Sequence, residues 1–216
     1  MYYQSVAPNR MVVNTLTEHR RSTNTRGYRK VKRADDEQRT RARIVDAAEE
    51  LHGTVGPARA SVSAIADAAD VTRATVYRHF PDDESLFFAC SGQWLSRQRL
   101  PDPDAWQVEG DPLETLRAGL TDIYRYYRAG ESMLTNVHRD FHVVPDRVRL
   151  ARLEGEQRWR DTLLKALPGR RRAVVRAAVA HATAFATWRS LCIDQGLSDA
   201  DAAQLMVAMT RAAAGR

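Results

Sequence analysis

The stretch Ser61–Phe87, SVSAIADAADVTRATVYRHFPDDESLF, determines the fold that this sequence predicts. It holds two short segments with apolar residues at helical spacing, and each follows a residue that can cap a helix, Ser61 and Thr72. The small Ala66 lies where the two helices must approach closely, and Asp70 occupies the turn between them. That turn needs a left-handed residue, a conformation that Asp tolerates. The pattern therefore predicts a helix-turn-helix.

The second of these helices carries side chains suited to nucleic acid. In a helix-turn-helix, the N-terminal residues of the second helix meet base edges in the major groove. Thr72 can donate to a phosphate, Arg73 can donate to guanine O6 and N7, and Thr75 can contact a thymine methyl or a phosphate. Tyr77 and His79 are polar aromatic residues that suit contacts with the sugar-phosphate backbone. The polar positions thus predict a DNA-reading face.

The apolar positions of the same helix, Val76 and Phe80, are four apart and are predicted to point inward. Helical periodicity continues on both sides of the motif, and the proline-rich segment 100–112 separates the two halves as a linker. The helices are expected at residues 38–53, 62–69, 73–80, 82–99, 112–129, 131–143, 146–167, 171–195 and 198–213. No alternating strand pattern occurs, so the fold class is all-α.

The charge of the chain is concentrated at one end. Lysine and arginine number 33 against 27 acidic residues, which gives a net charge of +6 over 216 residues. Residues 1–33 have a net charge of +7. The remaining residues are close to neutral, with a net charge of −1. Residues 1–37 also have few apolar residues, which predicts a disordered basic arm for a polyanionic partner. With two cysteines, no secretory signal and no spanning segment, we expect a cytoplasmic protein without membrane or disulfide framework.

The motif SVSAIADAADVTRATVYRHFPDDESL resembles the DNA-binding domain of the TetR/AcrR family of transcriptional regulators. The resemblance implies an N-terminal three-helix helix-turn-helix DNA-binding domain followed by a helical ligand-binding and dimerisation domain. The expected limits are 1–37 for the basic arm, 38–99 for the DNA-binding domain with its connecting helix, and 100–216 for the effector-binding domain. The resemblance also implies a repressor that binds a near-palindromic double-stranded operator as a dimer and is released by a small-molecule effector.

The resemblance further assigns DNA contacts residue by residue. They fall on Ser61, Ser63, Arg73, Ala74, Thr75, Tyr77, Arg78 and His79. Two positions depart from the family pattern, because Asp70 replaces the usual turn glycine and Asp83 replaces the usual basic residue at the start of the next helix. Asp83 removes a phosphate contact, and we expect the basic arm to compensate through Arg29, Lys30, Lys32 and Arg33 along phosphates or in a minor groove.

The C-terminal half is expected to bind a small hydrophobic or aromatic effector between its helices. The predicted pocket residues are Tyr124, Tyr127, His138, Phe141, Trp159 and Trp188. Packing in an ordinary core is the alternative for each aromatic residue, and a metal pair at His138 and His142 is an alternative for the histidines. The resemblance implies a homodimer through the last two helices, which are rich in small apolar residues.

Two other classes of protein are possible for an all-α chain. A di-iron helical enzyme needs two Glu-x-x-His motifs, and the sequence contains only Glu49 to His52. No phosphate-binding loop, nucleophile elbow or dinucleotide fingerprint occurs, so we expect no enzyme, cofactor or metal site. The remaining alternative is a ligand-independent architectural DNA-binding protein, whose C-terminal half would be filled and whose sequence specificity would be weak.

Overall fold

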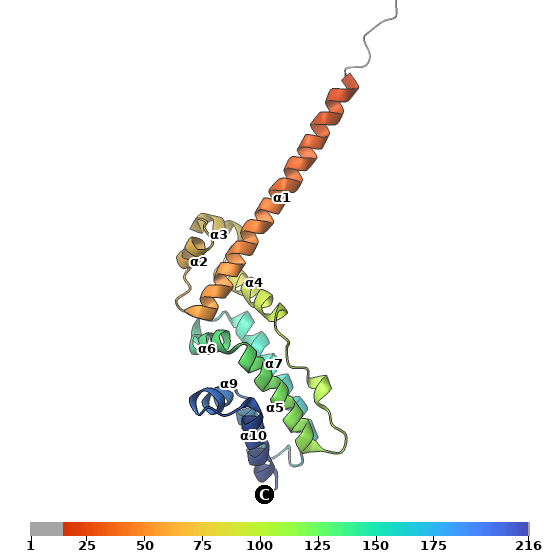
Figure 1. The fold of residues 1–216 in the computed structure, drawn as a ribbon, viewed down its shortest axis with the longest axis vertical. Helices are drawn as coiled ribbons and strands as arrows, with labels where there is room; N and C mark the ends of the chain where they lie inside the picture. The colour runs from red at the N-terminus through yellow and green to blue at the C-terminus, as the bar shows by residue number, and fades with distance from the viewer. Residues whose placement is uncertain (1–14, 216) are drawn as a thin grey trace, which may run out of the picture. The chain divides into compact units, whose positions relative to one another are not determined.

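The computed structural model describes the backbone of residues 15–215 and the side chains of residues 27–215. Over this range the chain is helical and has no strand, as the sequence predicts (Figure 1). No helix in this part of the chain is long and apolar enough to cross a bilayer. The helices are α1 Thr15–Thr54, α2 Val62–Ala68, α3 Arg73–His79, α4 Asp83–Ser96, α5 Pro112–Ala129, α6 Glu131–Arg139, α7 Asp146–Ala166, α8 Ala173–Ala182, α9 Phe185–Arg189 and α10 Asp199–Ala214.

Helix α1 starts much earlier than the apolar pattern predicts. The sequence predicts disorder over residues 1–37, and the first fourteen residues lie outside the described range, but from Thr15 the backbone is helical. Residues 28–39 are all exposed. This part of the helix is therefore stabilised by its backbone hydrogen bonds and by local ion pairs such as that of Arg39 with Asp36. The chain divides into two units, residues 1–43 and 44–216. The domain limits predicted at 37 and 99 stay predictions.

The first hydrophobic core lies between residues 44–54 of α1 and helices α2, α3 and α4. Apolar residues at spacings of three and four, such as Ile44 and Ala48, place one face of α1 against the other three helices. The core consists of Ile44, Val45, Ala47, Ala48, Ile65, Ala66, Ala69, Val76, Phe80, Leu86 and Cys90. It holds α2 and α3 in the geometry of a helix-turn-helix.

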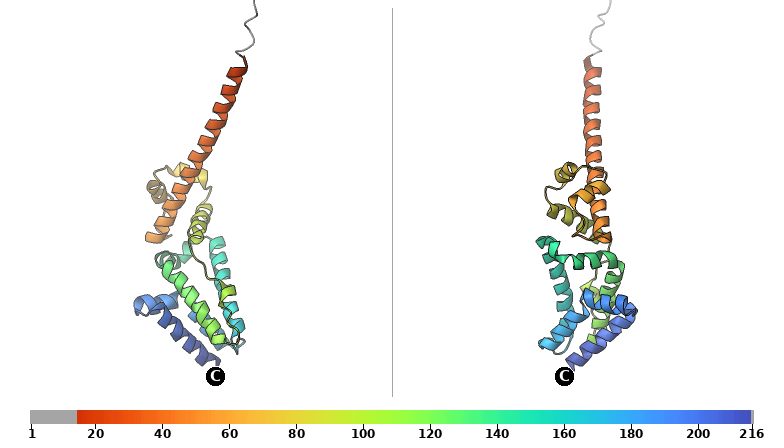
Figure 2. Two further views of the ribbon diagram at one scale, coloured as in Figure 1. Left: turned by 45° about the vertical axis from the view of Figure 1, so that its right-hand side comes forward. Right: turned by 90° about the vertical axis from the view of Figure 1, so that its left-hand side faces the viewer.

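The second core lies among α5 to α10. Helix α10 packs on α5 and α8, α7 packs on α5 and α8, and α6 runs crosswise near the ends of α5 and α7 (Figures 1 and 2). The apolar stripe of α5 supplies the centre, with Leu116, Leu120, Ile123 and Tyr127 each no more than 1% exposed. Since α7 buries only Leu163 among its 21 residues, it is the least enclosed long helix of this bundle.

The proline-rich segment 100–112, predicted as a linker, is anchored in the second core. It contains the short 3₁₀ helix Pro103–Trp106, and Trp106 is only 2% exposed. The Trp106 indole donates to Asp122 at 3.0 Å, and Gly119 lets the ring approach α5. A Cβ at Gly119 would lie 2.6 Å from Leu163 and 3.0 Å from Trp106, so the three residues are closely packed. The prolines predict a linker, but the segment also contains this buried tryptophan.

The single helix predicted at 171–195 is broken in the structure. Helix α8 ends at Ala182, α9 begins at Phe185, and a π-helical turn follows over Ser190–Asp194. At the break, the Tyr124 and Tyr127 hydroxyls donate to the carbonyls of residues 182 and 183, each at 2.8 Å. These two hydrogen bonds satisfy buried carbonyl groups that a continuous helix would use itself. The break is therefore stabilised by residues of α5, far away in the sequence.

Candidate nucleic-acid interface and effector region

The turn between α2 and α3 has the geometry that the sequence predicts. Asp70 has a positive φ of 51°, and no other non-glycine residue in the described range does. The backbone N–H of Val71 donates to the carbonyl of Ala66 at 3.0 Å, which closes the turn. Ala66 is 2% exposed at the helix crossing, where a larger side chain would separate the helices.

Both predicted caps are formed. The Ser61 hydroxyl accepts the N–H of Ala64 at 3.2 Å, and the Thr72 hydroxyl accepts the N–H of Thr75 at 3.1 Å. The hydroxyls of Thr72 and Thr75 also lie 3.0 Å apart. The first turn of α3 is thus fixed by its own side chains, which lowers the entropy lost when that turn contacts a partner.

Helix α3 separates apolar from polar side chains as predicted. Val76 and Phe80 are each 1% exposed and anchor the helix in the first core. Tyr77 is 41% exposed although it is a large aromatic residue. Among the other predicted contact residues, Ser61, Thr72, Arg73, Ala74, Arg78 and Ser63 are exposed, while Thr75 and His79 are half-buried. The outward face therefore presents arginine, hydroxyl and phenol groups from one rigid helix.

The start of α4 is acidic for a structural reason. The Asp82 carboxylate accepts the N–H of Ser85 at 2.7 Å and so caps the helix. Asp83 and Glu84 follow in the first turn, where carboxylates interact favourably with the positive end of the helix dipole. All three acidic residues are exposed, so the start of α4 presents negative charge to the solvent.

A buried polar pair ties α1 to α4 beneath this interface. The Nδ1 atom of His52 lies 3.4 Å from the Cys90 sulfur, and the imidazole packs against Phe87 with ring centroids 4.7 Å apart. His52 is 6% exposed, and burial lowers its pKa to about 4. Burial also raises the pKa of the Cys90 thiol to about 12. Cys90 and Cys192 are both free and buried.

We expect the folded state to lose stability as the pH falls from about 6.5 to about 4 because of His52. In that range the unfolded chain binds a proton at this imidazole and the folded chain does not, so protonation favours unfolding. The loss attributable to His52 is about 3 kcal/mol and is complete below its folded-state pKa. Urea unfolding at stepped pH values measures it. His52→Leu should flatten the dependence, whereas the exposed His142→Gln should not; identical slopes in all three proteins would contradict the assignment.

The end of α1 and the loop between α1 and α2 are held by side chains along α6 and by Asp140, which follows it. The Gly53 carbonyl accepts hydrogen bonds from Ser132 Oγ at 2.5 Å and from Asn136 Nδ2 at 2.8 Å. Arg139 donates to the carbonyl of residue 55 at 2.8 Å, and Asp140 accepts the N–H of residue 58 at 3.1 Å. Hydrogen bonds from Arg139 lower the pKa of Asp140 to about 2, so the carboxylate is ionised at neutral pH. We call this set of contacts the α6 joint.

Gly56 shows how tightly the α6 joint is packed. Its φ is +94°, a value that L side chains rarely adopt, and a Cβ there would overlap the Arg139 and Asp140 side chains. The joint therefore connects the helix-turn-helix to the C-terminal bundle through close, charge-assisted contacts. No part of it was recognised from the sequence, because its members lie about eighty residues apart.

The six predicted effector residues fall into two groups. Tyr124, Tyr127 and Trp188 are at most 1% exposed, and each donates a hydrogen bond inside the core; the Trp188 indole donates to Asp199 at 2.9 Å. His138, Phe141 and Trp159 are half-buried. The first group thus has the packing of core residues, and the second keeps part of its surface exposed.

The structure brings three of these residues, Tyr127, His138 and Trp188, around Phe185, an aromatic residue that was not selected for the predicted pocket. The His138 ring stacks on Phe185 with centroids 4.5 Å apart, and Phe185 lies edge-on to Tyr127 at 5.2 Å. Trp159 lies edge-on to Tyr127 at 6.5 Å. Phe141 instead lies in the 3₁₀ turn Phe141–Val143, where the guanidinium of Arg149 is 5.9 Å from its ring.

Three surface grooves of the described residues lie elsewhere. One of about 540 Å³ adjoins the α6 joint between α1, α4 and α6, and one of about 750 Å³ lies beside Trp106 and Asp122. A third, of about 470 Å³, lies at the start of α5 and the end of α7. Their lining residues include none of the six predicted effector residues, so the predicted pocket stays a prediction.

The possible metal motifs have other contacts. Glu49 accepts a hydrogen bond from Arg97 at 2.9 Å, and His52 is buried beside a thiol. His138 contacts Arg152, and His142 is exposed. Among the side chains described, no group of three His, Cys, Asp or Glu residues is placed to hold a metal ion.

The compact three-helix core, the capped second helix and its exposed polar face define a helix-turn-helix DNA-binding protein. Residues 44–90 match the family described as "Bacterial regulatory proteins, tetR family". The matched residues run from the last part of α1 through α2 and α3 into α4, so this part of the chain is similar to the DNA-binding domain of that family. A search among curated proteins finds no match.

Solved structures share the fold over most of the chain. A TetR-like transcriptional regulator from Rhodococcus sp. RHA1 is 19% identical with a TM-score of 0.59, covering 82% of this chain and 97% of its own. PfmR, a TetR family regulator from Thermus thermophilus, is 21% identical with a TM-score of 0.52 and coverages of 80% and 94%. NalD from Pseudomonas aeruginosa is 22% identical with a TM-score of 0.51 and coverages of 82% and 96%.

Proposed function

We propose that this chain is an effector-responsive repressor that binds a near-palindromic operator as a homodimer. The observation that carries the proposal is the outward face of α3, where Arg73, Thr75 and Tyr77 project from a helix anchored by two buried residues. Their chemistry matches direct readout of base edges and phosphates in a major groove. NalD, which shares the fold, is described as the secondary repressor of a multidrug efflux pump, and this supports the repressor assignment.

Selection of bound DNA from a random pool, at two salt concentrations, tests the proposal. We expect enrichment of an inverted repeat whose half-sites are one helical turn apart, about 34–36 Å centre to centre, because two recognition helices then enter successive major grooves. The enriched site should bind at least about 1,000-fold more tightly than random DNA at physiological salt. Enrichment without symmetry, or no enrichment at either salt concentration, would contradict it.

The effector response is proposed to pass through the α6 joint. Ser132, Asn136, Arg139 and Asp140 hold the loop that precedes α2, so a displacement of α6 changes the support of the helix-turn-helix. The half-buried His138, which precedes Arg139 on α6, faces the C-terminal bundle. A ligand that moves His138 therefore has a short physical route to the DNA-binding helices.

Homodimerisation is proposed to use α8 and α10. Their outward faces carry exposed apolar or small residues at spacings of three and four, although the opposite faces are buried in the second core. The exposed set comprises Val174, Ala177, Leu205, Ala208, Met209 and Ala212. Small residues permit close approach of two helix pairs across a two-fold axis, as in a four-helix seam. We call this set the α8–α10 face.

The basic segment Arg29, Lys30, Lys32 and Arg33 is proposed to contact DNA phosphates. All four side chains are exposed on α1, and the start of α4 supplies negative charge where a phosphate contact is usual. Deleting residues 1–34 should weaken operator binding and reduce the slope of log K against log salt by about 0.9 for each phosphate interaction removed. Replacing the four cations by Gln should have the same effect with the chain length kept. Unchanged affinity and slope in both proteins would refute this role.

The second candidate is a ligand-independent architectural DNA-binding protein. The complete burial of Tyr124, Tyr127 and Trp188 favours it, because these predicted effector residues are packed as core. Such a protein would bind random and selected DNA with similar affinity, since it would recognise backbone and deformability. The ratio of specific to non-specific affinity in the selection experiment separates the two candidates.

A further inference from the structure

The inner face of α7 is polar where the surrounding bundle is aromatic. Arg152 and Glu156 each retain only 19% of their side-chain exposure, and Arg160 retains 22%. Charged groups removed from water are costly unless they are paired, so three of them on the inward side of one helix need an explanation. The first four turns of α7 contain no fully buried residue, which leaves this face incompletely covered.

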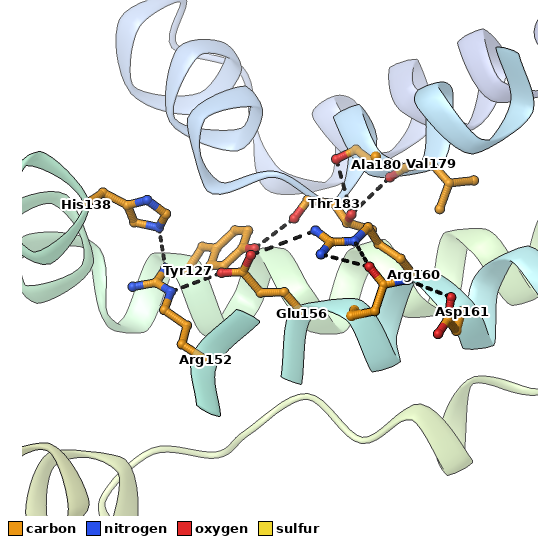
Figure 3. Close-up of polar contacts among 10 residues, drawn as sticks. Tyr127, His138, Arg152, Glu156, Arg160, Asp161, Val179, Ala180 and Thr183 are labelled. Atoms are coloured by element: carbon orange, nitrogen blue, oxygen red, sulfur yellow. Dashed lines mark hydrogen bonds and ion pairs between the residues drawn. The ribbon is translucent and has the colours of Figure 1, made fainter. Parts of the chain in front are cut away.

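The three charges do not balance one another. Arg152 donates to Glu156 at 3.0 Å, and Arg160 lies 3.8 Å from the other carboxylate oxygen of Glu156 (Figure 3). Arg152 also contacts Nε2 of His138 on α6. Two guanidinium groups thus share a single carboxylate. Burial, together with Arg152, lowers the pKa of His138 to about 3, so the imidazole adds no charge at neutral pH.

A glycine leaves space beside these groups. Gly155 lies on the same side of α7 as Arg152 and Trp159, which are three residues before it and four residues after it. A Cβ added at Gly155 would meet no atom within 4 Å, although the residue is half-buried. Glycine weakens a helix interior relative to alanine, and no close neighbour requires it here. The glycine therefore leaves open space on the side of α7 that also carries Arg152.

Aromatic rings accompany the charged groups, since His138 contacts Arg152 and Trp159 precedes Arg160 in α7. Trp159 lies edge-on to Tyr126 at 6.0 Å, and Phe185 stacks on His138 at 4.5 Å. Aromatic walls with a few convergent charged groups are the usual composition of a small-molecule site. Guanidinium groups bind carboxylates in bidentate geometry, and two of them side by side favour an anion over a neutral or cationic group.

We propose that this face of α7 binds a small aromatic carboxylate. The carboxylate bridges Arg152 and Arg160 in place of Glu156, and the ring lies over Gly155 against Trp159. This inference rests on the proposed effector response and names the chemical class of the effector. Because Arg152 holds His138, and Arg139 and Asp140 follow on the same helix, capture of Arg152 by the ligand releases a contact of α6 next to the α6 joint.

Isothermal titration of the full chain with matched probes tests the site. The probes are 2-naphthoate, the neutral 2-naphthamide and the cationic 2-naphthylmethylamine, which share one ring system. We expect the carboxylate to bind at least about 10-fold more tightly than the amide. Arg152→Met and Arg160→Met should each remove that preference, whereas Arg158→Met on the exposed side of α7 should keep it.

Two further variants separate the proposed site from general charge effects. Gly155→Leu should abolish binding by filling the space over the helix, and Glu156→Gln should strengthen carboxylate binding severalfold by removing the competing carboxylate. Equal affinity for acid and amide, tighter binding of the amine, or no binding of naphthoate at millimolar concentration would overturn the proposal. The unaltered chain is assayed for operator DNA in parallel. Loss of DNA recognition with the carboxylate preference intact would refute the regulator and leave the site standing.

Discussion

A chain carrying Leu205→Glu and Met209→Glu is expected to be a monomer at micromolar concentration and to bind its operator at least about 100-fold more weakly than the unaltered chain. Leu205 is 41% exposed and Met209 is 51% exposed, and they lie one helical turn apart on the outward side of α10. In a dimer built on the α8–α10 face, a two-fold axis brings both residues close to their copies in the partner. Four carboxylates would then meet in a region of small apolar residues.

The size of the effect has two sources. Burying unpaired charges costs several kcal/mol, which exceeds what a modest helix seam supplies. Loss of the dimer also uncouples the two half-sites, because the second recognition helix no longer binds at the high effective concentration that the first one provides. The fold of each protomer should persist, since substitutions at exposed helix positions typically change stability by less than about 0.5 kcal/mol.

The matched control is Leu150→Glu with Leu153→Glu. These leucines are 58% and 44% exposed on α7, outside the α8–α10 face, and they receive the same added charge. Light scattering coupled to size exclusion gives the mass of each protein, and circular dichroism confirms folding. A dimer that survives the α10 changes, or one that dissociates only with the α7 changes, would place the interface elsewhere.

The helix-turn-helix could be predicted because its determinants are local. Caps at Ser61 and Thr72, the left-handed Asp70 and the buried pair Val76 and Phe80 all lie within twenty residues, and each has one dominant structural reason. The outward side chains of α3 could then be assigned by exclusion. Their roles toward DNA still depend on a partner that the sequence does not contain.

The elements that were missed depend on contacts remote in sequence or on none at all. The exposed first part of α1 buries no apolar face, so periodicity gives no signal for it. The break after Ala182 is stabilised by the Tyr124 and Tyr127 hydroxyls of α5, and the alanine-rich sequence of α8 itself predicts continuation. Likewise, Trp106 in a proline-rich segment resembles a loop until its packing against Gly119 is seen.

The effector region could be predicted from the sequence only in part. Aromatic residues were chosen from composition, and three of them proved to be fully packed. Arg152 and Glu156 give no sequence signal for a binding site, because arginine and glutamate four residues apart are typical of a solvated helix face. Only the fold shows that this side of α7 turns inward toward His138 of α6 (Figure 3). The one sequence signal available was Gly155, a glycine in the middle of a long charged helix.

Arg73→Ala is expected to weaken operator binding by about 30- to 20,000-fold in the dimer. A bidentate arginine–guanine contact contributes about 1–3 kcal/mol, and the change removes it from both half-sites. Arg73 is the first residue of α3, where a positive charge is unfavourable toward the helix dipole. Its presence there does not serve helix stability, so the alanine variant should be folded and at least as stable.

The specificity of the variant identifies what Arg73 contacts. Repeating the DNA selection with Arg73→Ala should relax the preference at one base pair in each half-site and leave the other positions unchanged. Arg158→Ala, which removes the same charge from exposed α7, should bind the original site normally. A uniform loss across all sequences, with a salt slope reduced by about one for each half-site, would show instead that Arg73 contacts a phosphate. In that case the base-reading residues would have to be sought at the half-buried Thr75 and the exposed Tyr77, further along α3.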